Sequence, residues 1–278
     1  MGISLGNIQT HTKILWVKPK NFFSITSLKN WTVNATQTQF RDTMTPMEIA
    51  QQRVRDWTSG PLDLSKLGLT KLPELPAGLE VLWCGENKLY ELPDSLPTVL
   101  RVLDCHDNLL GALPKTLPAS LRYLTCSGNQ LAILPNPLPA GLELLDCGEN
   151  RLTILPDPLP VGLTELFCSG NCLNTLPENL PASIKQLHCA DNKLTKLPNI
   201  LPEALSELYC YNNQLTALPD PLPEGLSSLL CWSNMLTALP DPLPECLISL
   251  RCKDNRLVRL PDRPAYHTYC WEFWLGFL

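Results

Sequence analysis

The chain has 278 residues, and its 27 acidic and 22 basic side chains give it a formal net charge of −5. This balance, together with the lack of a basic stripe, argues against nucleic acid as a partner. No run of 18 apolar residues occurs in the sequence, so we expect no membrane insertion.

The first 44 residues differ in composition from the rest of the chain. They are polar, rich in Thr and Asn, and lack the apolar stretch of about 7–15 residues that marks a Sec signal. Such a composition is typical of a poorly ordered segment. We therefore expect residues 1–44 to form a flexible leader and a possible secretion signal.

A helical segment is predicted at residues 45–61. Thr45 can cap the helix, Pro46 suits its first position, and Glu48 completes a capping box. The apolar residues that fall on one helical face are Met47, Ala50, Val54 and Trp57. Gly60 and Pro61 then favour the end of the helix.

Residues 62–264 carry a tandem repeat with a period of 21 residues. One unit reads L-x-x-L-x-C-x-x-N-x-L-x-x-L-P-x-x-L-P-x-x, as at 142–162. Its first half matches the leucine-rich repeat signature, in which each unit contributes one short strand to a horseshoe. The sequence predicts a leucine-rich-repeat solenoid of about ten units, in the α/β horseshoe class with short parallel strands. Because the first unit would otherwise expose its core, residues 45–61 are predicted to be its helical N-terminal cap.

Within a unit, alternation along the strand assigns residues to faces. Leu145 and Cys147 should be buried, whereas Leu144, Asp146 and Gly148 should share the open face. Asn150, three residues after the cysteine, should satisfy backbone groups where the chain turns inward. The cysteines that recur in this register are Cys84, Cys105, Cys126, Cys147, Cys168, Cys189, Cys210, Cys231 and Cys252.

The second half of each unit contains two prolines, as at 155–160. Proline removes a backbone donor and biases the preceding residue away from helical angles. We expect the convex side of the solenoid to be extended or polyproline II-like.

After Pro261 the repeat register is lost and the chain becomes aromatic. Residues 265–278 are predicted to be either a C-terminal cap or a truncated boundary whose downstream partner is missing. Bare apolar ends of a repeat array favour aggregation, so either reading gives this segment a structural role.

The twelve cysteines do not form the paired framework of a small secreted domain. Because the cysteines recur at one identical buried position in each unit, we predict packed, reduced thiols and hence a reducing compartment. No cysteine pair has a nearby histidine at a zinc spacing, so we expect no metal and no cofactor.

The capping helix, the stretch LDLSKLGLTKLPELP and the units LPxxLPxxLxxLxCxxNxLxxLP together resemble the LPX-type leucine-rich-repeat effectors of Gram-negative bacteria. This family includes YopM-like scaffolds and IpaH/SspH/SlrP-type ubiquitin ligases. The resemblance covers about residues 45–262, and it departs from the family where the column residue is cysteine in place of valine or another aliphatic residue. It implies injection into host cells by a dedicated secretion system, and binding of host proteins in the host cytoplasm.

The ligase members of that family carry a helical catalytic domain with a Cys-x-Asp site after the repeats. The 17 residues after Pro261 cannot hold such a domain. Cys-x-Asp does occur within the array, at 105–107, 189–191 and 252–254, but each cysteine there is an inward column residue. Since a reactive cysteine needs an accessible, electropositive setting, we expect no enzymatic activity.

The residues on the open face are free to vary within the repeat, so they can carry function. An aromatic and apolar cluster bordered by two basic residues is predicted to bind a protein partner through the concave face. Its members are Phe167, His188, Tyr209, Tyr211, Leu230, Trp232, Arg251 and Lys253. The alternative is that the rings only pack on one another across units.

Acidic residues follow the cysteines at the turn, and we interpret them as a solvated rim, with a cation site as the alternative. They are Glu86, Asp107, Glu149, Asp191 and Asp254.

The sequence thus predicts a protein–protein recognition scaffold, secreted as a bacterial effector that acts on host proteins. The competing hypothesis is the substrate-recognition part of an IpaH/SspH-type ubiquitin ligase whose catalytic domain is absent from this chain. A third is a bacterial internal scaffold that is never exported.

Overall fold

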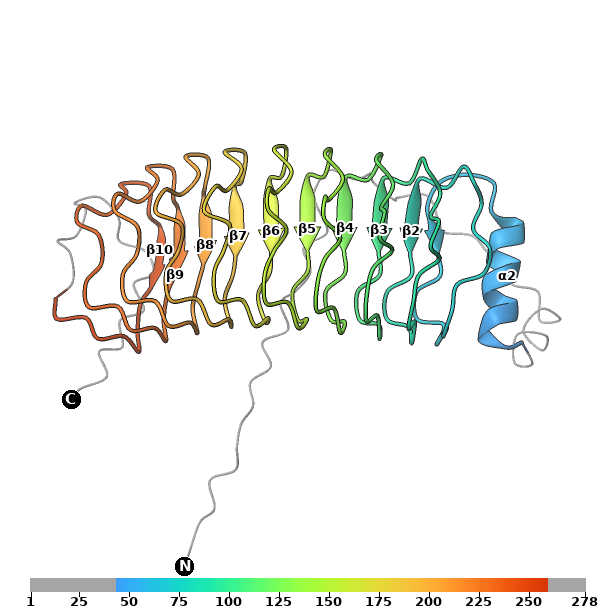
Figure 1. Cartoon of the computed structure of the whole chain (residues 1–278), viewed down its shortest axis with the longest axis horizontal. Coiled ribbons are helices and arrows are strands. Elements are labelled where there is room, and N and C mark those ends of the chain that lie inside the picture. The colour runs from blue at the N-terminus through green and yellow to red at the C-terminus, as the bar shows by residue number, and fades with distance from the viewer. Residues whose placement is uncertain (1–43, 260–278) are drawn as a thin grey trace, which may run out of the picture. The chain divides into compact units, whose positions relative to one another are not determined.

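The computed structural model describes residues 44–259, and its main feature is one parallel sheet with ten strands in sequence order (Figure 1). Every strand pairs with the next in the register that the repeat predicts, for example Leu145 beside Leu166. The solenoid prediction is confirmed. The strands are β1 (Leu62–Asp63), β2 (Val81–Trp83), β3 (Val102–Asp104), β4 (Tyr123–Thr125), β5 (Leu144–Asp146), β6 (Glu165–Phe167), β7 (Gln186–His188), β8 (Glu207–Tyr209), β9 (Ser228–Leu230) and β10 (Ser249–Arg251).

The strands alternate between the two faces of the sheet as expected. In β6 the central Leu166 is fully buried, and its neighbours Glu165 and Phe167 are half-buried on the open face. The leucines of each turn continue the core behind the sheet, where Leu173 is also fully buried. We call each 21-residue unit of the array a rung. In the described residues, no rung contains a helix between its strand and the next strand, in agreement with the proline-rich second half of the repeat.

The asparagine column links neighbouring rungs through buried hydrogen bonds. The Nδ2 group of Asn171 donates to the carbonyl oxygens of Cys147, Cys168 and Ser169 at 3.0, 3.1 and 3.3 Å. Its Oδ1 accepts the N–H of Leu152 at 2.9 Å. One side chain therefore satisfies groups of its own rung and of the preceding rung, which confirms the prediction.

The helix α2 (Pro46–Asp56) lies beside the first strand at the start of the array (Figure 1). Thr45 Oγ1 accepts the N–H of Glu48, and the Glu48 carboxylate accepts the N–H of Thr45, so the capping box is confirmed. Ala50 is fully buried against the core, and Arg53 donates to the carbonyl oxygen of Asp63 in β1 at 2.6 Å. These contacts close the N-terminal end of the core.

The cysteine column is buried along most of the array. The ladder cysteines from Cys84 to Cys231 are fully buried, whereas Cys252 in the last described rung is half-buried. All cysteines within residues 44–259 are free thiols. Cys172 is half-buried and Cys246 is exposed, and both lie outside the ladder.

Burial should make the ladder thiols unreactive in the folded protein. It raises the pKa of Cys189 to about 12 and the pKa of Cys84 well above its ordinary value, so little thiolate forms near neutral pH. With a maleimide reagent we expect rapid labelling of Cys246 and labelling of Cys84 to Cys231 only after denaturation. Peptide mass spectrometry measures each site, and rapid labelling of all ladder cysteines in the native protein would contradict the buried column.

Two predicted segments lie outside the described residues. These are the leader, apart from Met44, and the aromatic segment 265–278. The predicted boundaries at 45–61, 62–264 and 265–278 stay predictions. Between residues 44 and 259 the structure has no helix of the length and hydrophobicity needed to cross a membrane.

Candidate partner-binding face of the sheet

The candidate site is built on the open face of the sheet, where the repeat leaves side-chain identity free. Adjacent strands place residues of the same repeat position about 4.8 Å apart. Phe167, His188 and Tyr209 occupy paired positions of β6, β7 and β8. The sheet therefore brings side chains that are 21 residues apart in sequence into direct contact.

Phe167, His188 and Tyr209 form a continuous stack, which we call the three-ring stack. The ring centroids of Phe167 and His188 are 4.6 Å apart, and those of His188 and Tyr209 are 4.0 Å apart with planes inclined by 10°. All three side chains are half-buried, so their edges face outward. The rings therefore pack on one another across rungs, and their role in binding a partner stays a prediction.

Tyr211 and Trp232 form a second unit, the two-ring stack, at the position just after the cysteine. Their centroids are 3.8 Å apart and their planes are inclined by only 6°. Leu230 is half-buried and pairs with Tyr209 in the strand register, so it extends the apolar surface by one rung. Arg251 pairs with Leu230 in the strand register, and both Arg251 and Lys253 are exposed in the last described rung.

The imidazole of His188 is held neutral by its surroundings. Desolvation between two aromatic rings lowers its pKa to about 4. The carboxylate of Glu207 would favour the protonated ring, but it lies 3.7 Å from Nε2, too far for a hydrogen bond. Nε2 is buried and has no hydrogen-bond partner within the described part of the chain, so we expect burial to outweigh the carboxylate.

This histidine should make folding stability depend on pH. Its ordinary pKa is 6.5 and its folded-state pKa is about 4. Between these values the unfolded chain binds a proton that the folded chain does not, so stability should fall as the pH decreases from about 6.5 to 4. Urea denaturation at several pH values should show a smaller loss for His188→Phe than for the wild type, and an equal loss in both proteins would contradict this.

Asp146 contributes a pH dependence of the opposite sign, because burial raises its pKa to about 6. As the pH falls below about 6, protonation removes the buried negative charge of the folded state, so this group makes the protein more stable at lower pH. The effect is present in both proteins and cancels in the comparison between His188→Phe and the wild type.

A polar cluster occupies the open face on the N-terminal side of the rings, and sequence reasoning missed it. The Asp146 side chain is buried, and its oxygens accept the Ser127 hydroxyl at 3.0 Å and the N–H of Gly148 at 3.1 Å. Two rungs from Asp146, Asp104 Oδ1 lies 2.6 Å from Nδ1 of His106, and this contact raises the pKa of His106. Asp146 and Gly148 are nevertheless buried on the open face to which the sequence assigned them, because neighbouring rungs cover both. The small residues Ser127 and Gly148 beside the aspartate were the available sequence signal.

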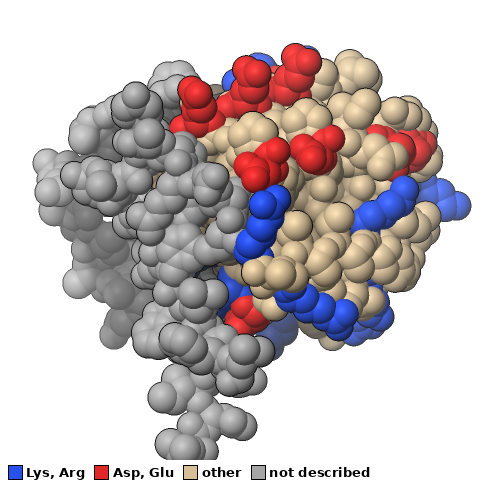
Figure 2. Space-filling view, turned by 90° about the vertical axis from the view of Figure 1, so that its left-hand side faces the viewer, with Lys and Arg blue, Asp and Glu red and all other residues tan. Residues whose placement is uncertain are grey.

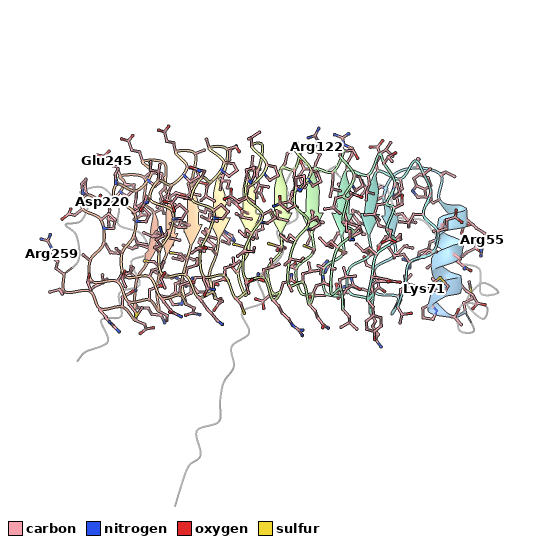
Figure 3. All side chains as sticks on the ribbon, in the orientation of Figure 1. Arg55, Lys71, Arg122, Asp220, Glu245 and Arg259 are labelled. Carbon is pink, nitrogen blue, oxygen red and sulfur yellow. The ribbon has the colours of Figure 1, made fainter. Side chains whose placement is uncertain are left out.

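The acidic rim residues sit at the turn that follows each cysteine, and their side chains are exposed. Seen end-on, the array also gathers Asp and Glu along its upper edge (Figure 2), where Figure 3 labels Glu245 and Arg122. That edge precedes the strands and is a different surface from the rim, which follows them. Within residues 44–259, no group of three or more His, Cys, Asp or Glu side chains is arranged to hold a metal ion. The rim therefore offers negative charge without a cation site of that kind.

Parallel strands, a buried cysteine column and an asparagine ladder together define a leucine-rich repeat solenoid. No model of a known protein family and no curated protein matches the sequence. Among solved structures, the chain is similar to YopM from Yersinia enterocolitica, with 36% identity, a TM-score of 0.61, and coverage of 71% of this chain and 47% of that one. This chain therefore spans about half the length of that YopM chain.

Two further solved structures share the fold. A Shigella effector leucine-rich repeat domain is 26% identical with a TM-score of 0.52, over 66% of this chain and 86% of that one. The functional domain of InlJ from Listeria monocytogenes, described as including a cysteine ladder, is 24% identical with a TM-score of 0.51, over 70% of this chain and 53% of that one. The likeness to InlJ concerns the fold alone.

Proposed function

We propose that this protein is a recognition scaffold that binds a protein partner through the open face of its sheet. The observation that carries the proposal is the pair of aromatic stacks, which hold Tyr209, Tyr211 and Trp232 half-buried on the face that the repeat leaves variable. Contiguous apolar surface of this kind marks interaction sites, and Tyr, Trp and Arg are the residues most enriched in binding hot spots.

We further propose that the protein is a secreted bacterial effector that acts on host proteins in a reducing compartment, and that it is not an enzyme. The similarity to YopM and to the Shigella effector domain supports the effector role, and the free buried thiols agree with a reducing compartment. The cysteines of the Cys-x-Asp motifs at 105–107 and 189–191 are fully buried, and burial raises their pKa, which disfavours nucleophilic catalysis.

The second candidate is the substrate-recognition part of an IpaH/SspH-type ubiquitin ligase. It is favoured by the Shigella effector domain, of which this chain covers 86%. Sequencing the gene beyond Leu278 distinguishes the two: an in-frame helical domain with an accessible Cys-x-Asp supports the ligase, and a stop codon there supports the scaffold.

The binding face can be tested by affinity capture from host-cell lysate with quantitative mass spectrometry. The double variant Tyr209→Ala/Trp232→Ala should lose specific partners, because removal of hot-spot residues weakens binding by about 30-fold or more. Tyr90→Ala is the matched control, since Tyr90 is a 62% exposed aromatic residue outside both ring stacks. Identical captured sets for the double variant and the wild type would contradict the proposal.

A further inference from the structure

Three of the five acidic rim residues are regularly spaced along the open face. Asp107, Glu149 and Asp191 occupy the same repeat position in alternate rungs, and the rungs between them carry Gly128 and Gly170. Two rungs correspond to about 10 Å along the stack. The face therefore presents one carboxylate about every 10 Å over five rungs.

The three carboxylates are held in place without a basic partner. Two of the three side chains lean over the intervening glycines: a methyl group at Gly128 would collide with the Asp107 carboxylate, and one at Gly170 would collide with that of Glu149. The third carboxylate, Asp191, accepts a hydrogen bond from Nδ2 of Asn212 at 2.7 Å. Across residues 44–259, no lysine or arginine lies within 4.0 Å of any of the three carboxylates. Burial and repulsion from Asp191 and Asp107 raise the pKa of Glu149, which agrees with uncompensated negative charge.

Small side chains separate this rim from the three-ring stack. Ser127, Gly148, Ser169 and Ala190 follow one another at the position just after the cysteine, and the next residue in that column is Tyr211. Since Trp232 covers one face of the Tyr211 ring, the other face is turned toward the rung of Ala190. Burial, followed by the negative charge of Asp191 and Glu149, raises the pKa of Tyr211, which agrees with this aromatic ring and the carboxylates sharing one region of the sheet.

We propose that this region of the open face binds a basic partner segment in the polyproline II conformation, with Lys or Arg at every third residue. The inference rests on the proposed function, since it names the chemistry of a partner on the same face. A polyproline II chain rises about 3.1 Å per residue with three residues per turn, so every third side chain points the same way about 9.3 Å further on. That repeat matches the carboxylate spacing, the small residues leave room for the backbone, and aromatic rings such as Tyr211 are the surfaces on which prolines dock.

The test is fluorescence anisotropy with two labelled nine-residue peptides of the same composition. One carries arginine at the first, fourth and seventh positions with proline elsewhere, and the other carries its three arginines together at one end. We expect the spaced peptide to bind about three- to tenfold more tightly, the range that three exposed ion pairs can give, and to weaken as salt is added. Equal affinity of the two peptides would overturn the spacing argument, and no binding of either would overturn the proposal.

A triple variant of the rim and a matched single variant test whether the three carboxylates select the spaced peptide. The triple variant Asp107→Asn/Glu149→Gly/Asp191→Asn removes the charges, and glycine suits the left-handed backbone of Glu149, where φ is 50°. The control is Glu86→Gly at the same repeat position with φ 54°, because Glu86 already pairs with Lys66 at 2.9 Å. The triple variant should abolish the preference for the spaced peptide and the control should keep it, with melting curves confirming that both are folded.

The outcomes separate this inference from the function on which it rests. If the Tyr209→Ala/Trp232→Ala variant loses captured partners while the triple rim variant keeps both partners and peptide preference, the basic-segment inference fails and the recognition face stands. If neither variant changes capture, the recognition face fails as well.

Discussion

Replacing Leu229 by alanine is expected to lower the free energy of unfolding by about 2–5 kcal/mol, whereas the same change at the next residue, Leu230, should cost about 1 kcal/mol or less. Leu229 is fully buried in the centre of β9, so truncation leaves a cavity that close-packed rungs cannot fill. Leu230 is half-buried on the open face, where water replaces the lost side chain. Urea denaturation followed by circular dichroism measures both values.

Leu229→Ala and Leu230→Ala serve as controls for each other, because the two substitutions are chemically identical and lie in one strand. A shift of the sheet register by one residue would exchange the two faces and reverse the ranking. A larger loss for Leu230→Ala than for Leu229→Ala would therefore contradict the assignment of the open face, and with it the candidate site.

Asn171→Ala should destabilise the protein by about 1–3 kcal/mol, the usual cost of leaving buried polar groups without partners. The substitution removes three donated hydrogen bonds and one accepted bond, and it leaves the N–H of Leu152 unsatisfied in the interior. The carbonyl of Cys147 loses one of its two amide donors and keeps the other, Asn150 Nδ2 at 3.2 Å. Because these groups belong to two rungs, the effect should reduce the coupling between rungs as well as the local stability. Chemical denaturation measures the change in the midpoint.

Asn174→Ala is the matched control for that prediction. Asn174 lies three residues further along the same rung and is exposed, so its replacement should change stability by no more than about 0.5 kcal/mol. Equal effects of the two substitutions would show that the asparagine column does not stabilise the turn.

Much of the fold could be predicted because each signal is repeated in register. The pairing of Leu and Cys two residues apart sets the buried face, and the Asn three residues later sets the turn. A wrong assignment in one unit would disagree with the pattern in all the others, because each rung buries its leucines against neighbours that carry leucine at the same positions. The capping box of Thr45 and Glu48 is equally local, because all its groups lie within one helical turn.

The candidate site was predictable only as a set of positions. Sequence placed Phe167, His188 and Tyr209 in one column, but it did not distinguish solvent-facing rings from rings stacked on one another. The burial of Asp146 was missed, because it depends on Ser127 and Gly148 and on the close approach of adjacent rungs. The sequence also did not show which rim charges lack a basic partner. Within residues 44–259, Glu86 pairs with a lysine and Glu149 has no lysine or arginine within 4.0 Å, although both occupy the same repeat position.

The sequence alone determined the parallel solenoid, its helical N-terminal cap, the inward cysteines and the asparagine ladder. Each of these follows from local periodicity and from the need to bury apolar groups and satisfy backbone polar groups. The tertiary structure decided which open-face rings touch, which carboxylate is buried and which carboxylates have no lysine or arginine partner within residues 44–259. Those properties depend on side-chain orientation between rungs 21 residues apart, and the repeat leaves that orientation free.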